Sequence, residues 1–244
     1  YKDNYDHLMT SGLYDALVNE RLLIPHDVVI TEPAELDSAY KIIRPAIVDF
    51  ISYPYEWCFS QLKDAALTTL RIQKTAQKYG MSLKDCSAYN IQFQKGKPVL
   101  IDTLSFERYR EGQPWVAYRQ FCQHFLAPLA LMSYKDVRLN QLLRVHIDGI
   151  PLDLASLLLP FRTYFSFSLL TNIHLHSRSQ KHFAGLYSIN KDRYKVSRLS
   201  FMGILDNLEH GIKGLQWQPK GTEWAEYYKE TNYSEESLRH KKQI

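Results

Sequence analysis

Three polar side chains could together hold a divalent cation and orient a substrate hydroxyl. Asp85 is followed five residues later by Asn90, and Asp102 stands twelve residues beyond Asn90. A carboxylate can accept a hydrogen bond from a substrate hydroxyl, and carboxylate and amide oxygens are the hard ligands that Mg²⁺ prefers. We therefore take Asp85 as the candidate catalytic residue and Asn90 with Asp102 as candidate metal ligands for phosphoryl transfer.

A hairpin is needed to return Asp102 to the neighbourhood of Asn90. The apolar segments 91–93 and 99–101 enclose a polar stretch in which Gly96 stands where a turn is expected. This pattern predicts two antiparallel strands joined by a short turn. The second strand would then end beside the first, which is the geometry that the metal pair requires.

The remaining elements suggest a partly β beginning and a mostly helical body. Apolar residues recur at helical spacing from Ser60 until Gly80, which predicts a long amphipathic helix directly before the cluster. Further helical patterns cover 114–129, 139–146 and 152–159, an opening helix is expected near residues 8–18, and short strands are expected at 26–30 and 40–43. The predicted fold class is α+β.

The cluster, the long helix and the hairpin resemble the aminoglycoside-phosphotransferase and protein-kinase-like superfamily. The resemblance places Asp85 at the catalytic-loop aspartate, Asn90 at the metal-binding asparagine and Asp102 at the metal aspartate of the following loop. It extends from about Tyr5 to Leu159 as an order of elements. It implies a protein-kinase-like fold with a truncated N-lobe and a mostly helical C-lobe, and Mg-ATP as a cofactor.

Several positions depart from that family's pattern. Leu83 replaces the histidine that usually stands two residues before the catalytic aspartate, and Asp102 is followed by Thr103 and Leu104 where protein kinases have Phe-Gly. No glycine-rich phosphate loop precedes the first helix, and Lys41 comes too late in the chain to serve as the nucleotide lysine. The resemblance therefore implies a kinase-like region without its nucleotide-gripping start.

A closer resemblance covers nearly the whole chain. The segments 51–57, 84–90, 100–106, 114–121 and 148–152 are similar to the region preceding the methyl-transfer domain in bacterial class I S-adenosylmethionine-dependent methyltransferases, some of them nodulation-associated. This likeness implies a methyl-transfer domain beyond Ile244 that binds S-adenosylmethionine. Within the chain, Gly211 and Gly214 come nearest to a cofactor-binding glycine pattern, and we interpret them as loop residues.

Three parts of the chain follow from these resemblances. Residues 1–57 would form a partial N-lobe and a hinge-like connector, and residues 58–215 a mostly helical C-lobe with the catalytic-like hairpin. Residues 216–244 would be a linker towards the methyl-transfer domain. Because the chain begins at Tyr1 and ends in a helix-like stretch, we expect it to be a fragment of a longer protein.

Composition excludes several classes of protein. Lys and Arg number 30 against 26 Asp and Glu, and a net charge of +4 is too small over 244 residues to predict a nucleic-acid or membrane-surface protein. The three cysteines stand far apart, which argues against a disulfide framework and favours the cytoplasm. No apolar run is long enough to predict a membrane span.

Other residues have both a functional and a structural interpretation. His174, His176 and His182 could bind a metal, although a polar face is the favoured interpretation. The basic and aromatic stretch 161–200 could bind nucleic acid or an anionic glycan, although a solvated face is favoured, so nucleic acid is an unlikely partner. We interpret Cys86 as a small buried side chain, and Trp57 and Trp115 as core anchors.

Three hypotheses follow. The first is a kinase-like companion region of a methyltransferase, which recognises a small-molecule or glycan acceptor or docks on the methyl-transfer domain. The second is a Mg-ATP-dependent small-molecule phosphotransferase that uses Asp85, Asn90 and Asp102. The third is a basic, aromatic binding module for nucleic acid or an anionic glycan.

Overall fold

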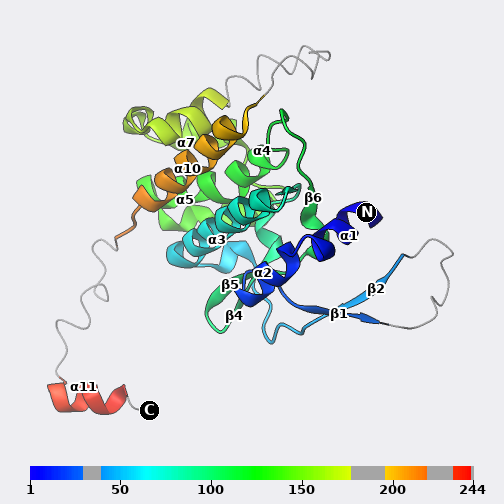
Figure 1. The fold of residues 1–244 in the computed structure, drawn as a ribbon. Helices are drawn as coiled ribbons and strands as arrows, with labels where there is room; N and C mark the ends of the chain where they lie inside the picture. The colour runs from blue at the N-terminus through cyan, green and yellow to red at the C-terminus, as the bar shows by residue number, and fades with distance from the viewer. Residues whose placement is uncertain (30–39, 177–195, 219–232, 243–244) are drawn as a thin grey trace.

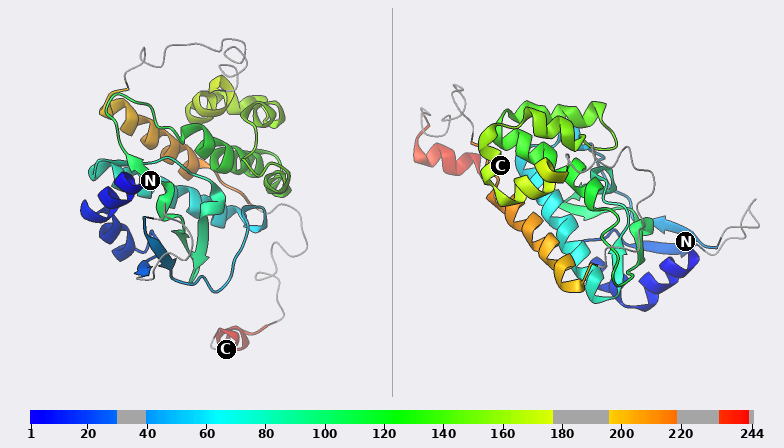
Figure 2. Two further views of the ribbon diagram at one scale, coloured as in Figure 1. Left: turned by 90° about the vertical axis from the view of Figure 1, so that its right-hand side faces the viewer. Right: turned by 90° about the horizontal axis from the view of Figure 1, so that it is seen from above.

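A long helix forms the centre of the protein. The computed structural model describes residues 1–29, 40–176, 196–218 and 233–242 (Figure 1). Helix α3 (Phe59–Lys78) confirms the predicted amphipathic helix, and its apolar face is buried. It lies beside α10 (Arg198–Gly214), as the views of Figures 1 and 2 show, and the ammonium group of Lys74 joins the two helices through ion pairs with Asp206 and Glu209.

The strands form short antiparallel pairs rather than one continuous sheet. β1 (His26–Val29) pairs with β2 (Ile42–Pro45), and β4 (Ile91–Gln94) pairs with β5 (Lys97–Leu100), which confirms the predicted hairpin. β3 (Met81–Leu83) pairs with β6 (Phe106–Arg108), so the two ends of the segment that holds the cluster are joined.

The opening segment is two helices, so the prediction of one continuous helix is wrong. Helix α1 (Lys2–Thr10) and helix α2 (Leu13–Asn19) are separated at Gly12, whose φ of +86° is incompatible with a right-handed helix. The apolar stripe that suggested one helix is still buried, because Leu8 and Leu17 both have no exposed surface. The break changes the direction of the chain without changing which side faces the core.

In the described part of the helical body, two π-helical turns are present. The predicted helix after Pro114 is composed of α4 (Tyr118–Phe121), the π-helix η4 (Cys122–Leu126) and α5 (Ala127–Tyr134). The other short helices are η1 (Pro54–Glu56), η2 (Ala88–Asn90), η3 (Thr103–Ser105), η5 (Val137–Gln141), α6 (Leu142–Val145), α7 (Leu152–Leu158), η6 (Phe161–Phe165), α8 (Phe167–Leu169) and the π-helix η7 (Leu170–Leu175). π-turns are uncommon and often occur near functional sites.

Gly211 and Gly214 lie inside helix α10, so their interpretation as loop residues is wrong. The reason for glycine is clearest at Gly211, where a Cβ atom would approach the Oγ of Ser168 to 2.1 Å. The missing side chain lets α10 pack closely against α8. Both glycines are therefore explained by helix structure rather than by a cofactor-binding turn.

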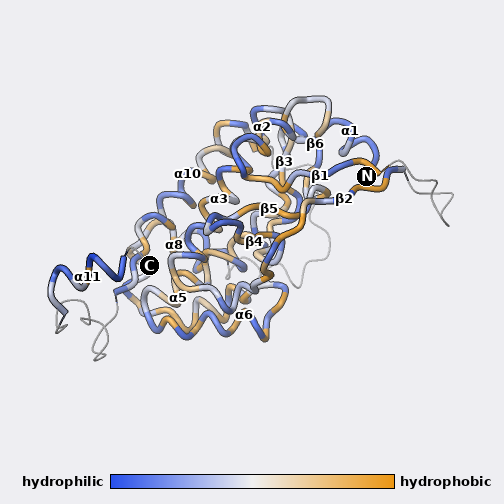
Figure 3. Tube along the Cα trace, turned by 90° about the horizontal axis from the view of Figure 1, so that it is seen from below, coloured by the Kyte–Doolittle hydropathy of each residue, from blue (hydrophilic) through white to orange (hydrophobic). Residues whose placement is uncertain are grey.

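Trp57 and Trp115 lie in the core, as predicted, since their exposed fractions are only 1% and 5%. Helix α11 (Glu235–Lys241) contrasts with this interior, since it is hydrophilic (Figure 3) and has no buried residue. In the part of the chain that the structure describes, no helix combines the length and apolar character needed to cross a membrane. The division at residues 57 and 215 stays a prediction.

Candidate functional site

The β4–β5 hairpin brings the side chains of Asn90 and Asp102 to the same hydroxyl group, that of Ser105. The backbone N–H of Ile101 donates to the carbonyl oxygen of Asn90 at 2.9 Å, which places the end of one strand beside the start of the other. The Nδ2 group of Asn90 donates to Oγ of Ser105 at 3.4 Å, and that hydroxyl donates to Oδ2 of Asp102 at 2.6 Å. The two predicted metal ligands therefore converge through Ser105.

Asp102 also caps the short helix η3. Its Oδ1 accepts the backbone N–H of Leu104 at 2.8 Å, while its Oδ2 accepts the Ser105 hydroxyl. An aspartate at this position fixes its carboxylate relative to the backbone, because both oxygens have a defined donor. Thr103 and Leu104, which replace Phe-Gly, therefore begin the short helix η3 that Asp102 caps.

Asp85 is held from two directions. Its Oδ1 accepts the backbone N–H of Ser87 at 2.9 Å and the Nε2 group of Gln120 at 2.8 Å. The Oε1 atom of Gln120 in turn accepts the backbone N–H of Cys86 at 2.6 Å. Within the described residues, Oδ2 of Asp85 has no hydrogen-bond partner, so it is the oxygen that could accept a substrate hydroxyl.

The backbone next to Asp85 is hydrogen-bonded to Ser105, the residue that contacts both candidate metal ligands. The N–H of Lys84 donates to the carbonyl oxygen of Ser105 at 2.8 Å, and the indole Nε1–H of Trp115 donates to the carbonyl oxygen of Leu83 at 2.8 Å. These bonds extend the β3–β6 pairing up to Asp85. Asn90 and Asp102 therefore share Ser105 as a hydrogen-bonding partner, and Asp85 is connected to them through the backbone of Lys84, although the chemistry of the three residues stays a prediction.

His124 is a buried titratable group close to Asp85. It lies in the π-helix η4, its imidazole is 1% exposed, and its ring meets the ring of Tyr89 edge-on with centroids 6.2 Å apart. Burial lowers the pKa of His124 to about 4, an effect that the carboxylates of Asp85 and Asp148 partly oppose. Nδ1 has no hydrogen-bond partner among the residues that the structure covers. His124 is therefore neutral at pH 7.

Cys86 does not offer a nucleophile. Its side chain is 2% exposed, which confirms its interpretation as a small buried residue. Burial, together with the neighbouring Asp85 carboxylate, raises the pKa of the Cys86 thiol well above its usual value. A protonated, enclosed thiol contributes packing rather than covalent chemistry.

Two lysines of this part of the chain contact tyrosine rings. The ammonium group of Lys41 lies over the rings of Tyr5 and Tyr40, at 5.3 and 5.2 Å from their centroids. The ammonium group of Lys84 lies 4.3 Å from the ring centroid of Tyr1. These cation–π contacts engage both ammonium groups with tyrosine rings. The expectation that Lys41 does not act as a nucleotide lysine stays a prediction.

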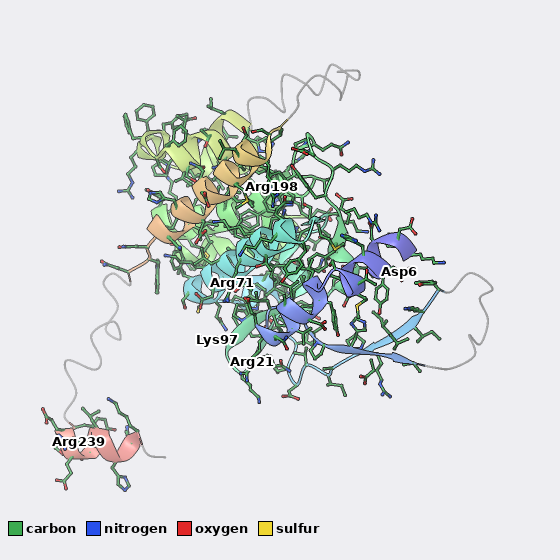
Figure 4. All side chains as sticks on the ribbon, viewed as in Figure 1. Asp6, Arg21, Arg71, Lys97, Arg198 and Arg239 are labelled. Carbon is green, nitrogen blue, oxygen red and sulfur yellow. The ribbon has the colours of Figure 1, made fainter. Side chains whose placement is uncertain are left out.

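A hollow of about 590 Å³ lies between α3, β5 and α10, away from the predicted cluster. Arg71 and Lys97, labelled in Figure 4, both line it, but none of Asp85, Asn90 and Asp102 does. Its charges are mixed, since Arg71 pairs with Glu20 at 2.7 Å. This hollow therefore gives no support to the predicted site.

The histidine pair near the C-terminal end of the helical body does not form a metal centre. His174 Nδ1 lies 2.8 Å from Oγ of Ser156, and its Nε2 lies 2.9 Å from Oγ1 of Thr163. Because the Thr163 hydroxyl donates to the carbonyl oxygen of Pro160 at 2.7 Å, it must accept from Nε2–H of His174. Both ring nitrogens thus have hydroxyl partners.

His182 and residues 177–195 of the basic stretch 161–200 lie outside the described residues. Among the residues that are described, no group of three or more His, Cys, Asp or Glu side chains is arranged to hold a metal ion. A cation at the cluster would therefore depend on amide and hydroxyl oxygens as well as carboxylates. The metal interpretation of the histidines has no support in this part of the chain.

Ser105 and Gln120 are site residues that the sequence prediction missed. A serine three residues after a helix-capping aspartate is a local signal that could have identified Ser105. Gln120 carries no such signal, because it lies 35 residues from Asp85 and reaches it only through the packing of α4. Sequence spacing alone cannot reveal a contact of that range.

S-adenosylmethionine has no evident site in the described residues. A strand, a glycine-rich turn and a following helix are the usual means of binding such a cofactor. The strands seen here form two-stranded antiparallel sheets, and Gly211 and Gly214 lie within a helix. The described part of the chain therefore does not fit this cofactor.

Comparison with known proteins finds a similar nodulation protein. It is 33% identical to the nodulation protein NoeA of Rhizobium meliloti (strain 1021) over 201 residues, which cover 81% of this chain and 42% of that protein. The chain thus spans less than half the length of this relative. No protein-family model matches the chain, and no solved structure matches it. The predicted resemblance is thus supported as far as similarity to one nodulation protein, and its extension to methyl transfer stays a prediction.

Proposed function

We propose that this chain is the kinase-like companion region of a longer S-adenosylmethionine-dependent methyltransferase, and that its Asp85, Asn90 and Asp102 cluster binds the acceptor substrate together with a divalent cation. The carrying observation is an asymmetry of the site. The two candidate metal ligands, Asn90 and Asp102, both bond the Ser105 hydroxyl, and the carbonyl oxygen of Ser105 bonds the residue before Asp85, whereas Lys41 is engaged with tyrosine rings. The described residues therefore provide groups for an acceptor and a cation, whereas Lys41 does not supply the lysine of a nucleotide site.

The donor atoms at the cluster fit a hard cation. The carboxylate of Asp102 and the amide oxygen of Asn90 would hold Mg²⁺, which would neutralise negative charge on the bound substrate. Asp85 would accept a hydrogen bond from the acceptor hydroxyl through Oδ2, because Gln120 and Ser87 already hold Oδ1. The chain's own residues therefore fix the position of the acceptor.

The length of the relative supports a companion role. The similarity covers 42% of the nodulation protein, so most of that protein lies outside the similar region. A methyl-transfer domain would belong to such an additional region, since the described residues do not fit S-adenosylmethionine. Asp85, Asn90 and Asp102 would then recognise or present a small-molecule or glycan acceptor to it.

Cation binding by the chain is the direct test. We expect Mn²⁺, followed by electron paramagnetic resonance, to bind the unmodified chain and to lose at least about tenfold in affinity with Asp102→Ala, because the charged ligand is gone. Asp136→Ala is a matched control, since Asp136 also caps a short helix by accepting the N–H of the second residue after it. Equal Mn²⁺ binding by the two variants would contradict the proposal.

A Mg-ATP-dependent phosphotransferase is the second candidate. The shared contact of Asn90 and Asp102 with Ser105 favours it, because these side chains could hold Mg²⁺ while Asp85 orients a hydroxyl for phosphoryl transfer. Magnesium-dependent ATP consumption that Asp102→Ala abolishes and Asp136→Ala preserves would establish this function. The companion proposal instead expects no ATP consumption above the level of Asp102→Ala.

A further inference from the structure

A hollow of about 320 Å³ lies where helices α8 and α10 meet the end of α5. Its volume is in the range of small-molecule binding sites. Aromatic rings, hydroxyls, an amide and an imidazole line it, and among the described residues no Asp, Glu, Lys or Arg side chain does. The hollow is therefore separate from the cluster of Asp85, Asn90 and Asp102.

A buried network orients the amide of Asn207, which lines this hollow. The hydroxyl of Tyr118 donates to Oδ1 of Asn172 at 2.5 Å, and Nδ2 of Asn172 donates to Oδ1 of Asn207 at 2.6 Å. Asn172 lies in the π-helix η7 and is only 3% exposed. Because Oδ1 of Asn207 accepts this bond, Nδ2 is its outward donor. That Nδ2 has no hydrogen-bond partner within the described residues, so both of its N–H groups are available to a ligand.

Phe167 adds an apolar surface to the same hollow, and the residue is 71% exposed. An aromatic ring beside a fixed amide donor suits a sugar, whose C–H face packs on aromatic rings and whose hydroxyls donate and accept hydrogen bonds. The guanidinium of Arg162 lies over the ring of Tyr134, 5.1 Å from its centroid, but does not line the hollow. A charged ligand would therefore lose water there without gaining an ion-pair partner.

We propose that this hollow binds a neutral saccharide, with the sugar ring on Phe167 and a sugar hydroxyl hydrogen-bonded to Nδ2 of Asn207. Gly214 keeps the space open, because it belongs to the lining and a Cβ atom there would meet nothing within 4 Å. The site goes beyond the proposed cation function and does not depend on it. Asp102→Ala should accordingly leave saccharide binding unchanged.

Saccharide binding by the unmodified chain is measured by saturation-transfer difference NMR. The probes are the methyl glycosides of glucose, galactose and mannose, and we expect a saturable signal that is strongest at ring C–H protons, because these lie on Phe167. The matching uronic acid of the sugar that binds best should bind at least about threefold more weakly, because its carboxylate has no cationic partner in the lining. No saturable signal from any of the three glycosides, or equal binding of the uronic acid, overturns the proposal.

Two substitutions in α10 place the binding in the hollow. Gly214→Leu fills the space and should weaken binding by more than about tenfold. Gly203→Leu is the matched control, since Gly203 also lies in α10 with nothing within 4 Å of its Cβ position but does not line the hollow. It should change the affinity by less than about twofold. Equal effects of the two substitutions contradict the proposed location.

Removal of the aromatic ring gives a second matched pair. Phe167→Ala should weaken binding by about three- to tenfold, whereas Phe161→Ala, at a residue that is 74% exposed and outside the lining, should have little effect. Thermal unfolding checks that each variant is folded. If Gly214→Leu does not fold, the exposed position of Phe167 still allows the decision.

The amide donor is tested separately. Asn207→Ala should weaken binding by about three- to tenfold through loss of its hydrogen bonds to the sugar. The buried Asn172 amide keeps a partner in this variant, because its Nδ2 also donates to the carbonyl oxygen of Ser168 at 2.7 Å. Unchanged affinity in both Phe167→Ala and Asn207→Ala places the sugar elsewhere and overturns the inference, while the cation function is decided by Mn²⁺ binding alone.

Discussion

The candidate site and the N-terminal hairpin are both built on short antiparallel strands, yet they differ in how firmly they are held. All three residues of β3 are buried, and side chains from other elements hold the loop that follows it. β1 and β2 contain only partly buried and exposed residues, and the side chains of their cross-strand ion pair, Arg44 and Asp27, are both more than 70% exposed. Burial and side-chain anchoring, rather than strand pairing, make the site rigid.

The largest expected difference between the two regions concerns packing. Phe106 in β6 is 2% exposed, and replacing it by alanine should lower the free energy of unfolding by about 3–5 kcal/mol, because a cavity remains in a buried position. Val28 in β1 is 45% exposed, and Val28→Ala should change stability by less than about 1 kcal/mol. Urea unfolding measures both. Comparable losses would show that the N-terminal hairpin is as firmly packed as the site.

The next difference concerns acid sensitivity. Because burial lowers the pKa of His124 to about 4, the unfolded chain binds a proton at higher pH than the folded chain does. The stabilisation by neutral His124 is therefore complete above pH 6.5 and is lost as the pH falls towards 4. The free energy of unfolding falls by about 3 kcal/mol, because the pKa of His124 differs by about 2.5 between the unfolded and the folded chain and one pKa unit corresponds to about 1.36 kcal/mol.

Urea unfolding at several pH values isolates this contribution. His124→Gln should lose less stability than the unmodified chain between pH 7 and pH 4, because the variant has no imidazole to protonate. His26 in β1 is the comparison, since burial also lowers its pKa but the side chain is only partly buried. His26→Gln should reduce the acid sensitivity less. Parallel pH profiles for the unmodified chain and His124→Gln would refute this account.

The smallest difference concerns single polar contacts. Gln120→Leu leaves Oδ1 of Asp85 and the N–H of Cys86 each without one partner, and should cost about 1–3 kcal/mol. Arg44→Ala removes an exposed ion pair of 3.5 Å and should cost less than about 0.5 kcal/mol. Both values come from the same unfolding assay. An effect of Arg44→Ala as large as that of Gln120→Leu would remove the contrast between the regions.

The elements that could be predicted were those with strong local signals. Helix α3 was predicted because its apolar residues recur at helical spacing, and the β4–β5 hairpin because two apolar runs flank Gly96. The pairing of β3 with β6 was not predicted, since the segments are short and more than 20 residues apart. The opening helix was predicted as one element because its apolar stripe continues across Gly12.

The same limit applies to the candidate site. Asp85, Asn90 and Asp102 were chosen by residue type and spacing; Asn90 and Asp102 share the Ser105 hydroxyl, whereas the Asp85 carboxylate bonds Gln120, and the role of all three stays a prediction. Gln120 was missed because α4 carries it to Asp85 from a distant part of the chain. His124 was missed for a similar reason, since its proximity to Asp85 follows from the π-turn and from the burial of that helix.

The sequence by itself determined the residue types at the cluster, the amphipathic helix before them and the hairpin that returns Asp102 to Asn90, because these depend on spacing and local turn chemistry. Only the tertiary structure decided which atoms hold those residues. Ser105 reaches Asn90, and Gln120 reaches Asp85, through contacts between segments that only folding brings together, and the folded core makes His124 neutral. Hydrogen-bond geometry and burial are properties of packed neighbours, and a linear order of residues does not contain them.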